Sequence, residues 1–244
     1  MTAEHQPDDL FTLWIYLSTS PLLGLTITLA AYLIGMSIYT RTNKNPLFNP
    51  VLIAVLLLVT LLWITDTPYS AYFEGAQFIH FLLGPATVAL AVPLYRNIQL
   101  VKRSITAILV AILAGSATAS LSAVAIGWLL GATEETLLSL APKSVTTPIA
   151  MGISDSLGGL PSLTAVLVIL TGISGAMFAT GTLNLLRIRD WRARGLAIGV
   201  AAHGIGTARA LGINPVAGAF ASLAMGLNGL ATAILLPVAV RLLM

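Results

Sequence analysis

The sequence contains no cysteine and very few charged residues. Without cysteine the chain can form no disulfide, no thiolate nucleophile and no cysteine-ligated zinc or iron–sulfur centre. Charged residues make up 9% of the 244 residues, against about 25% in a typical soluble domain. Lys and Arg number 12 and Asp and Glu number 9, and these charges are dispersed along the chain. The composition therefore excludes a soluble enzyme and a nucleic-acid-binding surface.

Long apolar segments take the place of the missing charges. Hydrophobic residues make up 57% of the chain and the mean hydropathy is +0.93. Stretches such as 54–62 are apolar at consecutive positions, unlike the alternating strands of a β-barrel. We expect an acidic extension, 1–12, followed by a single all-α, polytopic transmembrane domain, 13–244. Its apolar segments, most of them near the length of about 20 residues that crosses a bilayer, are 10–39, 47–64, 78–95, 105–130, 137–153, 160–186, 196–211 and 216–243.

The loops between these segments mostly carry charge of one sign. Basic residues gather in the loops at 41–44, 96–103 and 187–194, whereas the loops at 66–74 and 134–135 hold only acidic ones. Because cytoplasmic loops are enriched in Lys and Arg, the first two basic loops are expected inside if the amino terminus is outside. The third lies inside as well only if the segment 137–153 enters and leaves on the same face.

The content of the segment 137–153 also makes it a poor lipid-facing helix. Pro142 and Pro148 interrupt it, and proline removes backbone hydrogen bonds that lipid cannot replace. Between the prolines lie one lysine and several hydroxyls, namely Lys143, Ser144, Thr146 and Thr147. We therefore predict that this segment is broken or re-entrant.

Parts of the chain repeat. Residues 104–110 (SITAILV) resemble residues 162–168 (SLTAVLV), and Pro85 corresponds to Pro142 upstream of them. The pattern predicts two repeat copies, 78–130 and 137–186, each an interrupted segment followed by a long span. Interrupted segments at corresponding positions of two halves, often inverted repeats, are typical of a transport site near the bilayer midplane. The charges of the loops conflict with this pattern. They predict that the first interrupted segment crosses the membrane, whereas the second returns to the face from which it entered.

Three charged residues, Lys143, Asp155 and Arg209, lie neither in a clear loop nor at a chain end. Charge inside a membrane is costly, so such residues usually face a wet cavity or a partner. Lys143, the exposed amides of a broken helix and the hydroxyls of Ser144, Thr146 and Thr147 would together suit a small organic anion. The alternative is a lysine that reaches from a helix end to the membrane surface.

A second polar cluster occupies residues 202–209. His203 and Thr207 lie four residues apart and would share a helix face. The pKa of a histidine lies near neutral pH, so His203 could carry protons, although a plain interhelical hydrogen bond explains it equally well. Arg209 suits either a bidentate clamp on a carboxylate or a structural ion pair with Asp155.

Weaker signals complete the expected site. Thr87 is a candidate for binding the substrate only because of its place in the expected repeat. Asn228 lies in an apolar segment, where its side chain would form a hydrogen bond to another helix. Asp155, His203 and Asn228 are the candidates for binding a coupling ion. The sequence holds no paired carboxylates for hydrolysis, no metal-ligand spacing, no nucleophile elbow and no phosphate loop. We therefore expect no catalytic residue, metal or cofactor, and no enzyme.

Four long strings resemble the signatures of the LrgB/CidB family. They are 45–51 (NPLFNPV), 81–95 (FLLGPATVALAVPLY), 142–150 (PKSVTTPIA) and 195–210 (GLAIGVAAHGIGTARA), and the resemblance runs from about residue 20 to the end. It implies a holin-like or antiholin-like membrane protein that works with a separate LrgA/CidA-type subunit to control murein hydrolase activity and autolysis. It also implies carriage of small organic acids, because a plastid relative exchanges glycolate and glycerate and bacterial relatives are linked to pyruvate uptake.

From the residues and the resemblance together we expect a multi-pass protein of the bacterial inner (plasma) membrane. Its main expected function is secondary transport of small monocarboxylates such as glycolate, glycerate, lactate or pyruvate by alternating access. Coupling to H+ or Na+ and a homo-oligomeric state are expected, with no nucleic acid among its partners. The alternative is the holin-like role in autolysis.

Overall fold

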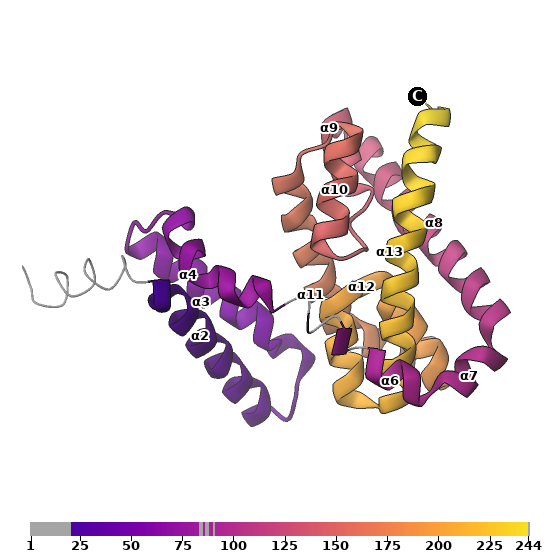
Figure 1. The fold of residues 1–244 in the computed structure, drawn as a ribbon, viewed down its shortest axis with the longest axis horizontal. Helices are drawn as coiled ribbons and strands as arrows, with labels where there is room; N and C mark the ends of the chain where they lie inside the picture. The colour runs from indigo at the N-terminus through magenta and orange to yellow at the C-terminus, as the bar shows by residue number, and fades with distance from the viewer. Residues whose placement is uncertain (1–20, 83–84, 86–87, 90, 244) are drawn as a thin grey trace, which may run out of the picture. The chain divides into compact units, whose positions relative to one another are not determined.

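The computed structural model describes residues 21–82, 85, 88–89 and 91–243, which form α-helices and one 3-10 turn (Figure 1). No strand occurs among them, in agreement with the expected all-α class. Within these described ranges, five helices, α2, α8, α11, α12 and α13, are long and apolar enough to cross a membrane. The chain divides into two compact units, 1–87 and 88–244.

The described residues of the first unit form α2 (Pro21–Arg41), the 3-10 turn η1 (Pro46–Phe48), α3 (Pro50–Ile64) and α4 (Tyr69–Phe81). The α3 helix begins at Asn49–Pro50 because the Asn49 Oδ1 accepts hydrogen bonds from the N–H groups of Val51 and Leu52, and proline fits the first helical position. The α2 helix packs against both α3 and α4.

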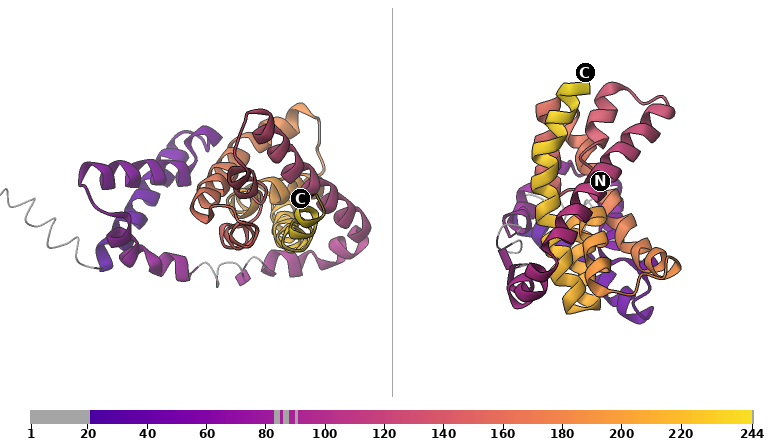
Figure 2. Two further views of the ribbon diagram at one scale, coloured as in Figure 1. Left: turned by 90° about the horizontal axis from the view of Figure 1, so that it is seen from above. Right: turned by 90° about the vertical axis from the view of Figure 1, so that its right-hand side faces the viewer.

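The second unit holds the remaining helices: α6 (Ala91–Arg96), α7 (Ile98–Arg103), α8 (Ile105–Leu129), α9 (Glu134–Leu140), α10 (Thr147–Leu157), α11 (Pro161–Leu185), α12 (Trp191–Ile213) and α13 (Pro215–Leu243). The α12 and α13 helices share the most extensive interface (Figures 1 and 2). Its core includes Val200 of α12 and Phe220 and Ala224 of α13, which pack with Ile108 and Ile112 of α8.

The α9 and α10 helices form a hairpin, which we call hairpin 1 (residues 134–160). The N–H of Leu160 donates to the Ser139 Oγ at 2.7 Å, although 21 residues separate them. The Thr164 hydroxyl lies 3.0 Å from the Ser139 carbonyl and 2.8 Å from the Ser154 Oγ. These contacts bring the last turn of α9 next to the end of α10 and the start of α11, so the chain turns back through residues 141–146. This break falls inside the segment 137–153, where the prolines predicted one.

The α12 helix also doubles back, at His203, where φ is 39° and ψ is −131°. The Thr207 Oγ1 lies 3.4 Å from the Ala221 carbonyl oxygen, and a Cβ added to Gly199 would collide with that same oxygen. In a straight helix residues eight positions apart lie about 12 Å apart. Residues 191–202 and 204–213 are therefore the two antiparallel legs of a second hairpin, hairpin 2. The apolar segment 196–211 is thus divided between the two legs of hairpin 2.

Each hairpin leads into a long helix that begins with proline. Asn214 caps α13 through an Oδ1 that accepts from the N–H of Val216 at 2.9 Å, and Pro161 begins α11 in the same way that Pro215 begins α13. The α11 helix runs antiparallel to the first leg of hairpin 2, whereas α13 runs parallel to it. The two hairpin-plus-helix modules therefore have opposite orientations.

The sequence carries a trace of this inverted duplication at a spacing of 54 residues. The matched positions are Gly152 and Gly206, Leu157 and Leu211, Gly158 and Gly212, Pro161 and Pro215, Gly172 and Gly226, and Gly175 and Gly229. It is a different pairing from the expected copies 78–130 and 137–186. That expected pairing stays a prediction, since residues 83–84, 86–87 and 90 of its first copy lie outside the described residues.

The close packing of α12 on α13 should depend on two glycines. A Cβ at Gly195 or Gly199 would collide with backbone carbonyls of α13, at Ala217 and Ala221 respectively. We expect Gly195→Ala and Gly199→Ala each to lower the thermal midpoint of the detergent-purified protein. Gly181→Ala is the matched control, because no atom lies within 4 Å of its added Cβ and alanine favours a helix by about 1 kcal/mol over glycine. Equal midpoints for all three variants would contradict the packing.

Candidate functional site

The turns of the two hairpins meet at one side chain of α13. The Asn228 Nδ2 lies 3.2 Å from the Ser144 carbonyl of hairpin 1 and 3.3 Å from the Val200 carbonyl of hairpin 2. Asn228 is only 1% exposed. An amide nitrogen has two hydrogens to donate, so a single buried side chain holds both hairpins.

The carbonyls that Asn228 binds are available because the helices are broken. Residues 141–146 lie between α9 and α10, and Ser144 is among them. In a continuous helix the Val200 carbonyl would accept from the N–H of residue 204, and the reversal at His203 redirects the chain at that point. Backbone groups at membrane depth need partners within the protein, and Asn228 provides them.

His203 fixes the turn of hairpin 2 to α11. Its side chain is buried, and its Nε2 lies 2.9 Å from the Val168 carbonyl. A carbonyl can only accept, so the Nε2 carries a hydrogen and donates it. The His203 carbonyl accepts from the Thr207 hydroxyl at 2.6 Å. Gly172 leaves room for the ring, because a Cβ there would lie 2.6 Å from the imidazole Cε1.

Lys143 lies in the turn of hairpin 1, next to Ser144. Its ammonium is 3.5 Å from the Ser144 Oγ. The α10 helix starts just beyond, at Thr147, and its N-cap residue Thr146 makes no side-chain capping bond. The first N–H groups of a helix have no partner within the helix. The turn therefore offers an ammonium, the amides at a helix start and hydroxyls in one place.

The structure separates other residues that the sequence placed in the site. Asp155 is exposed in the last turn of α10, toward the open end of hairpin 1. Arg209 is partly exposed on the second leg of hairpin 2. Within the described part of the chain no salt bridge joins the two, and they occupy equivalent positions, 54 residues apart, in the inverted modules. Thr87 lies outside the described residues.

Sequence reasoning missed the glycines that let each turn approach the opposite module. Gly175 of α11 meets Ala202 of hairpin 2, and Gly229 of α13 meets Ile149 at the start of α10. Gly175 and Gly229 are equivalent positions of the inverted repeat. The 54-residue spacing was the signal that could have found them.

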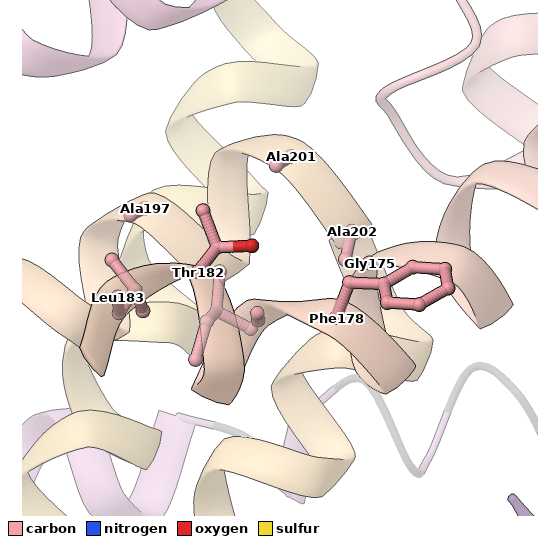
Figure 3. Close-up of a pocket in the computed structure, with 9 residues that line it drawn as sticks. Gly175, Phe178, Thr182, Leu183, Ala197, Ala201 and Ala202 are labelled. Carbon is pink, nitrogen blue, oxygen red and sulfur yellow. The ribbon is translucent and has the colours of Figure 1, made fainter. Parts of the chain in front are cut away.

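A groove of about 240 Å3 lies beside this region, between α11 and the first leg of hairpin 2 (Figure 3). Its lining includes Phe178, Leu183, Ile198 and Ala201, and Thr182 contributes a hydroxyl. No charged side chain faces it. An anion placed there would lose its hydration without gaining partners, so the groove does not suit an organic acid. Nor do three His, Asp or Glu side chains gather as metal ligands anywhere in the described ranges.

Comparison with known proteins shows which sequences the chain is similar to. The profile of the LrgB-like family matches residues 28–242. YxaC of Bacillus subtilis is 38% identical over 201 residues, which cover 82% of this chain and 87% of that protein. The holin-like protein CidB of Staphylococcus epidermidis is 31% identical over 220 residues (90% and 96%), and the antiholin-like protein LrgB of Bacillus cereus is 32% identical over 220 residues (89% and 95%). No solved structure matches the chain.

Removing the Asn228 amide should loosen both hairpins at once. We expect Asn228→Ala to lower the free energy of unfolding by about 1–3 kcal/mol, because the two carbonyls are left buried without a donor. Ser222→Ala in the same helix is the control, since the buried Ser222 hydroxyl donates only to Gly218 of its own helix, at 2.9 Å. Denaturant titration of the purified proteins measures both. A loss no larger for Asn228→Ala than for Ser222→Ala would show that the amide does not hold the hairpins.

Proposed function

The chain belongs to the LrgB-like family, and on that premise we propose that it transports small monocarboxylates across the bacterial inner membrane by alternating access. The substrate class is that of glycolate, glycerate, lactate and pyruvate. The observation that carries the proposal is the meeting of two broken helical hairpins, from modules of opposite orientation, at Asn228. Broken helices that meet in inverted modules are a recurrent design of membrane transport sites.

The chemistry of the hairpin 1 turn supports an anionic substrate. The Lys143 ammonium provides a positive charge, and the amino end of α10 adds the partial charge of the helix dipole. The α10 helix has 11 residues, so the turn lies about 16 Å from its far end at a rise of 1.5 Å per residue. Lys143 thus lies deep within the module and not at its open end. The hydroxyls of Ser144, Thr146 and Thr147 remain to bind the oxygens of the substrate.

The distribution of charge supports two re-entrant hairpins. If hairpin 1 and hairpin 2 each enter and leave on one face, α8 and α11 cross the membrane in opposite directions. The basic loop at 187–194 then lies on the same side as the basic loops at 41–44 and 96–103. The acidic loops at 66–74 and 134–135 lie on the other side, as the enrichment of Lys and Arg in cytoplasmic loops requires.

Coupling to H+ or Na+ is part of the proposal. With the His203 Nε2 donating to Val168, a neutral ring has its Nδ1 lone pair left to take up a proton. Asp155 at the open end of hairpin 1 is a second proton-carrying candidate, and Asn228 beside freed carbonyls is a candidate for Na+. Arg209 and Thr207 line hairpin 2 and would act on the anion along its path.

We further propose a homo-oligomer that assembles with an LrgA/CidA-type membrane subunit.

A second candidate function is a holin-like or antiholin-like role in autolysis, together with that subunit. The names of the relatives favour it over transport, since CidB is described as holin-like and LrgB as antiholin-like. The two functions are compatible, because a flux of organic acid changes the pH of the cytoplasm, on which cell-wall hydrolases can depend.

Transport predicts uptake by the purified protein. We expect proteoliposomes to take up radiolabelled glycolate, lactate or pyruvate, and Lys143→Ala to reduce the initial rate by about 10- to 100-fold, the cost of losing one charge-assisted contact. Lys102→Ala should leave the rate unchanged, because Lys102 is exposed in the short helix α7. Uptake that is equal in the Lys143→Ala and unmodified proteins would remove Lys143 from the mechanism.

The holin-like role predicts a phenotype in cells. Expression with an LrgA/CidA-type subunit should change the rate of autolysis, measured as loss of culture turbidity after a detergent is added to trigger autolysis. If transport underlies the phenotype, Lys143→Ala abolishes it. If the phenotype persists in Lys143→Ala while proteoliposomes move no organic acid, the regulatory role stands alone.

A further inference from the structure

The side-chain oxygen of Asn228 has no hydrogen-bond partner among the residues that the structure describes, although it is completely buried. The orientation of the amide is fixed by its other atom. The Nδ2 lies 3.2 and 3.3 Å from two carbonyl oxygens, and a flipped amide would put an oxygen against both of them. The unpartnered Oδ1 therefore follows from the way the amide binds the two hairpins.

A buried acceptor without a donor is unfavourable and uncommon, and it requires an explanation such as a missing ligand. The Oδ1 belongs to the same amide whose Nδ2 donates to Ser144 of hairpin 1, the residue that follows Lys143. Na+, for which Asn228 is also a candidate, could satisfy an amide oxygen, but the ammonium of Lys143 in the adjoining turn would repel it. A neutral O–H group carried by an anion avoids this repulsion, because its carboxylate can bind Lys143 while its hydroxyl donates to Asn228.

We propose that Asn228 is the specificity-determining residue of the site, and that its Oδ1 accepts a hydrogen bond from the hydroxyl of a small 2-hydroxycarboxylate. The inference rests on the proposed transport function and narrows its substrate class. In a 2-hydroxy acid the hydroxyl is on the carbon next to the carboxylate, so one molecule can bind both groups in the turn. The Nδ2 cannot serve a 2-keto acid instead, because the two backbone carbonyls already hold its hydrogens.

This geometry discriminates between acids of the same size. L-lactate has a hydroxyl where pyruvate has a keto oxygen and propionate has only hydrogens. Pyruvate would place its keto oxygen against the Oδ1, two acceptors in contact, and propionate would leave the Oδ1 unpaired. Sites that bind a substrate hydroxyl reject analogues that lack it far more strongly than apolar pockets reject a size change.

The test is a competition series in proteoliposomes of the full chain. Uptake of radiolabelled L-lactate is measured against unlabelled L-lactate, pyruvate and propionate. In the unmodified protein we expect half-inhibition by pyruvate and by propionate to need at least about 10-fold more acid than half-inhibition by L-lactate. Asn228→Leu should reduce these ratios to about threefold or less. Ser222→Ala, six residues away in α13, should keep them.

Each outcome bears on a different claim. If pyruvate and propionate inhibit the unmodified protein as well as L-lactate does, the role of Asn228 is wrong while transport stands. If Asn228→Leu lowers the uptake of all acids equally and keeps their ratios, or changes only a dependence on Na+, Asn228 serves the fold or a coupling ion instead. If no acid is taken up or bound, the proposed function itself fails. The series in the unmodified protein decides the question even if Asn228→Leu does not fold.

Discussion

A backbone carbonyl at membrane depth must find its hydrogen-bond donor inside the protein, and the second unit of this chain is organised around that requirement. Two helices break, at residues 141–146 and at His203, and each break leaves carbonyls that a continuous helix would use. The Asn228 amide donates to one carbonyl from each hairpin. Because a single side chain supplies both donors, the two turns cannot move independently without leaving a buried group unpaired.

Glycine makes this meeting possible. Gly172 and Gly175 of α11 lie against the turn of hairpin 2, and Gly229 of α13 lies against the start of α10 in hairpin 1. Each turn thus packs on the long helix of the other module, and a side chain at these positions would hold the turns apart. This mutual packing explains why the 54-residue repeat is carried mostly by glycine and proline: those residues shape the backbone, whereas the apolar positions between them need only be of suitable size.

The helices and one of the two breaks could be predicted from the sequence, because apolar length and proline are local signals. The reversal at His203 could not, since no proline marks it and the glycines beside it, Gly204 and Gly206, are also common in unbroken membrane helices. Lys143, His203 and Asn228 stood out as polar residues in apolar segments, and the structure brings them to the same two turns. Their partners did not stand out, because Val168 and Val200 contribute only carbonyl oxygens, which every residue has. The separation of Asp155 from Arg209 likewise depends on the doubling back of α12, which no local pattern encodes.

The two modules match in backbone but differ in charge. At equivalent positions of the second hairpin legs, hairpin 1 carries Asp155 and hairpin 2 carries Arg209. Their backbones turn back in opposite directions, so the acid and the base belong to opposite ends of the second unit. An Asp190 carboxylate, whose pKa the hydrogen-bonded Arg192 guanidinium lowers to about 2, remains charged next to the basic end at any physiological pH. The inverted repeat therefore supplies a symmetric frame for the turns, while the charges along the legs differ between the two ends of the second unit.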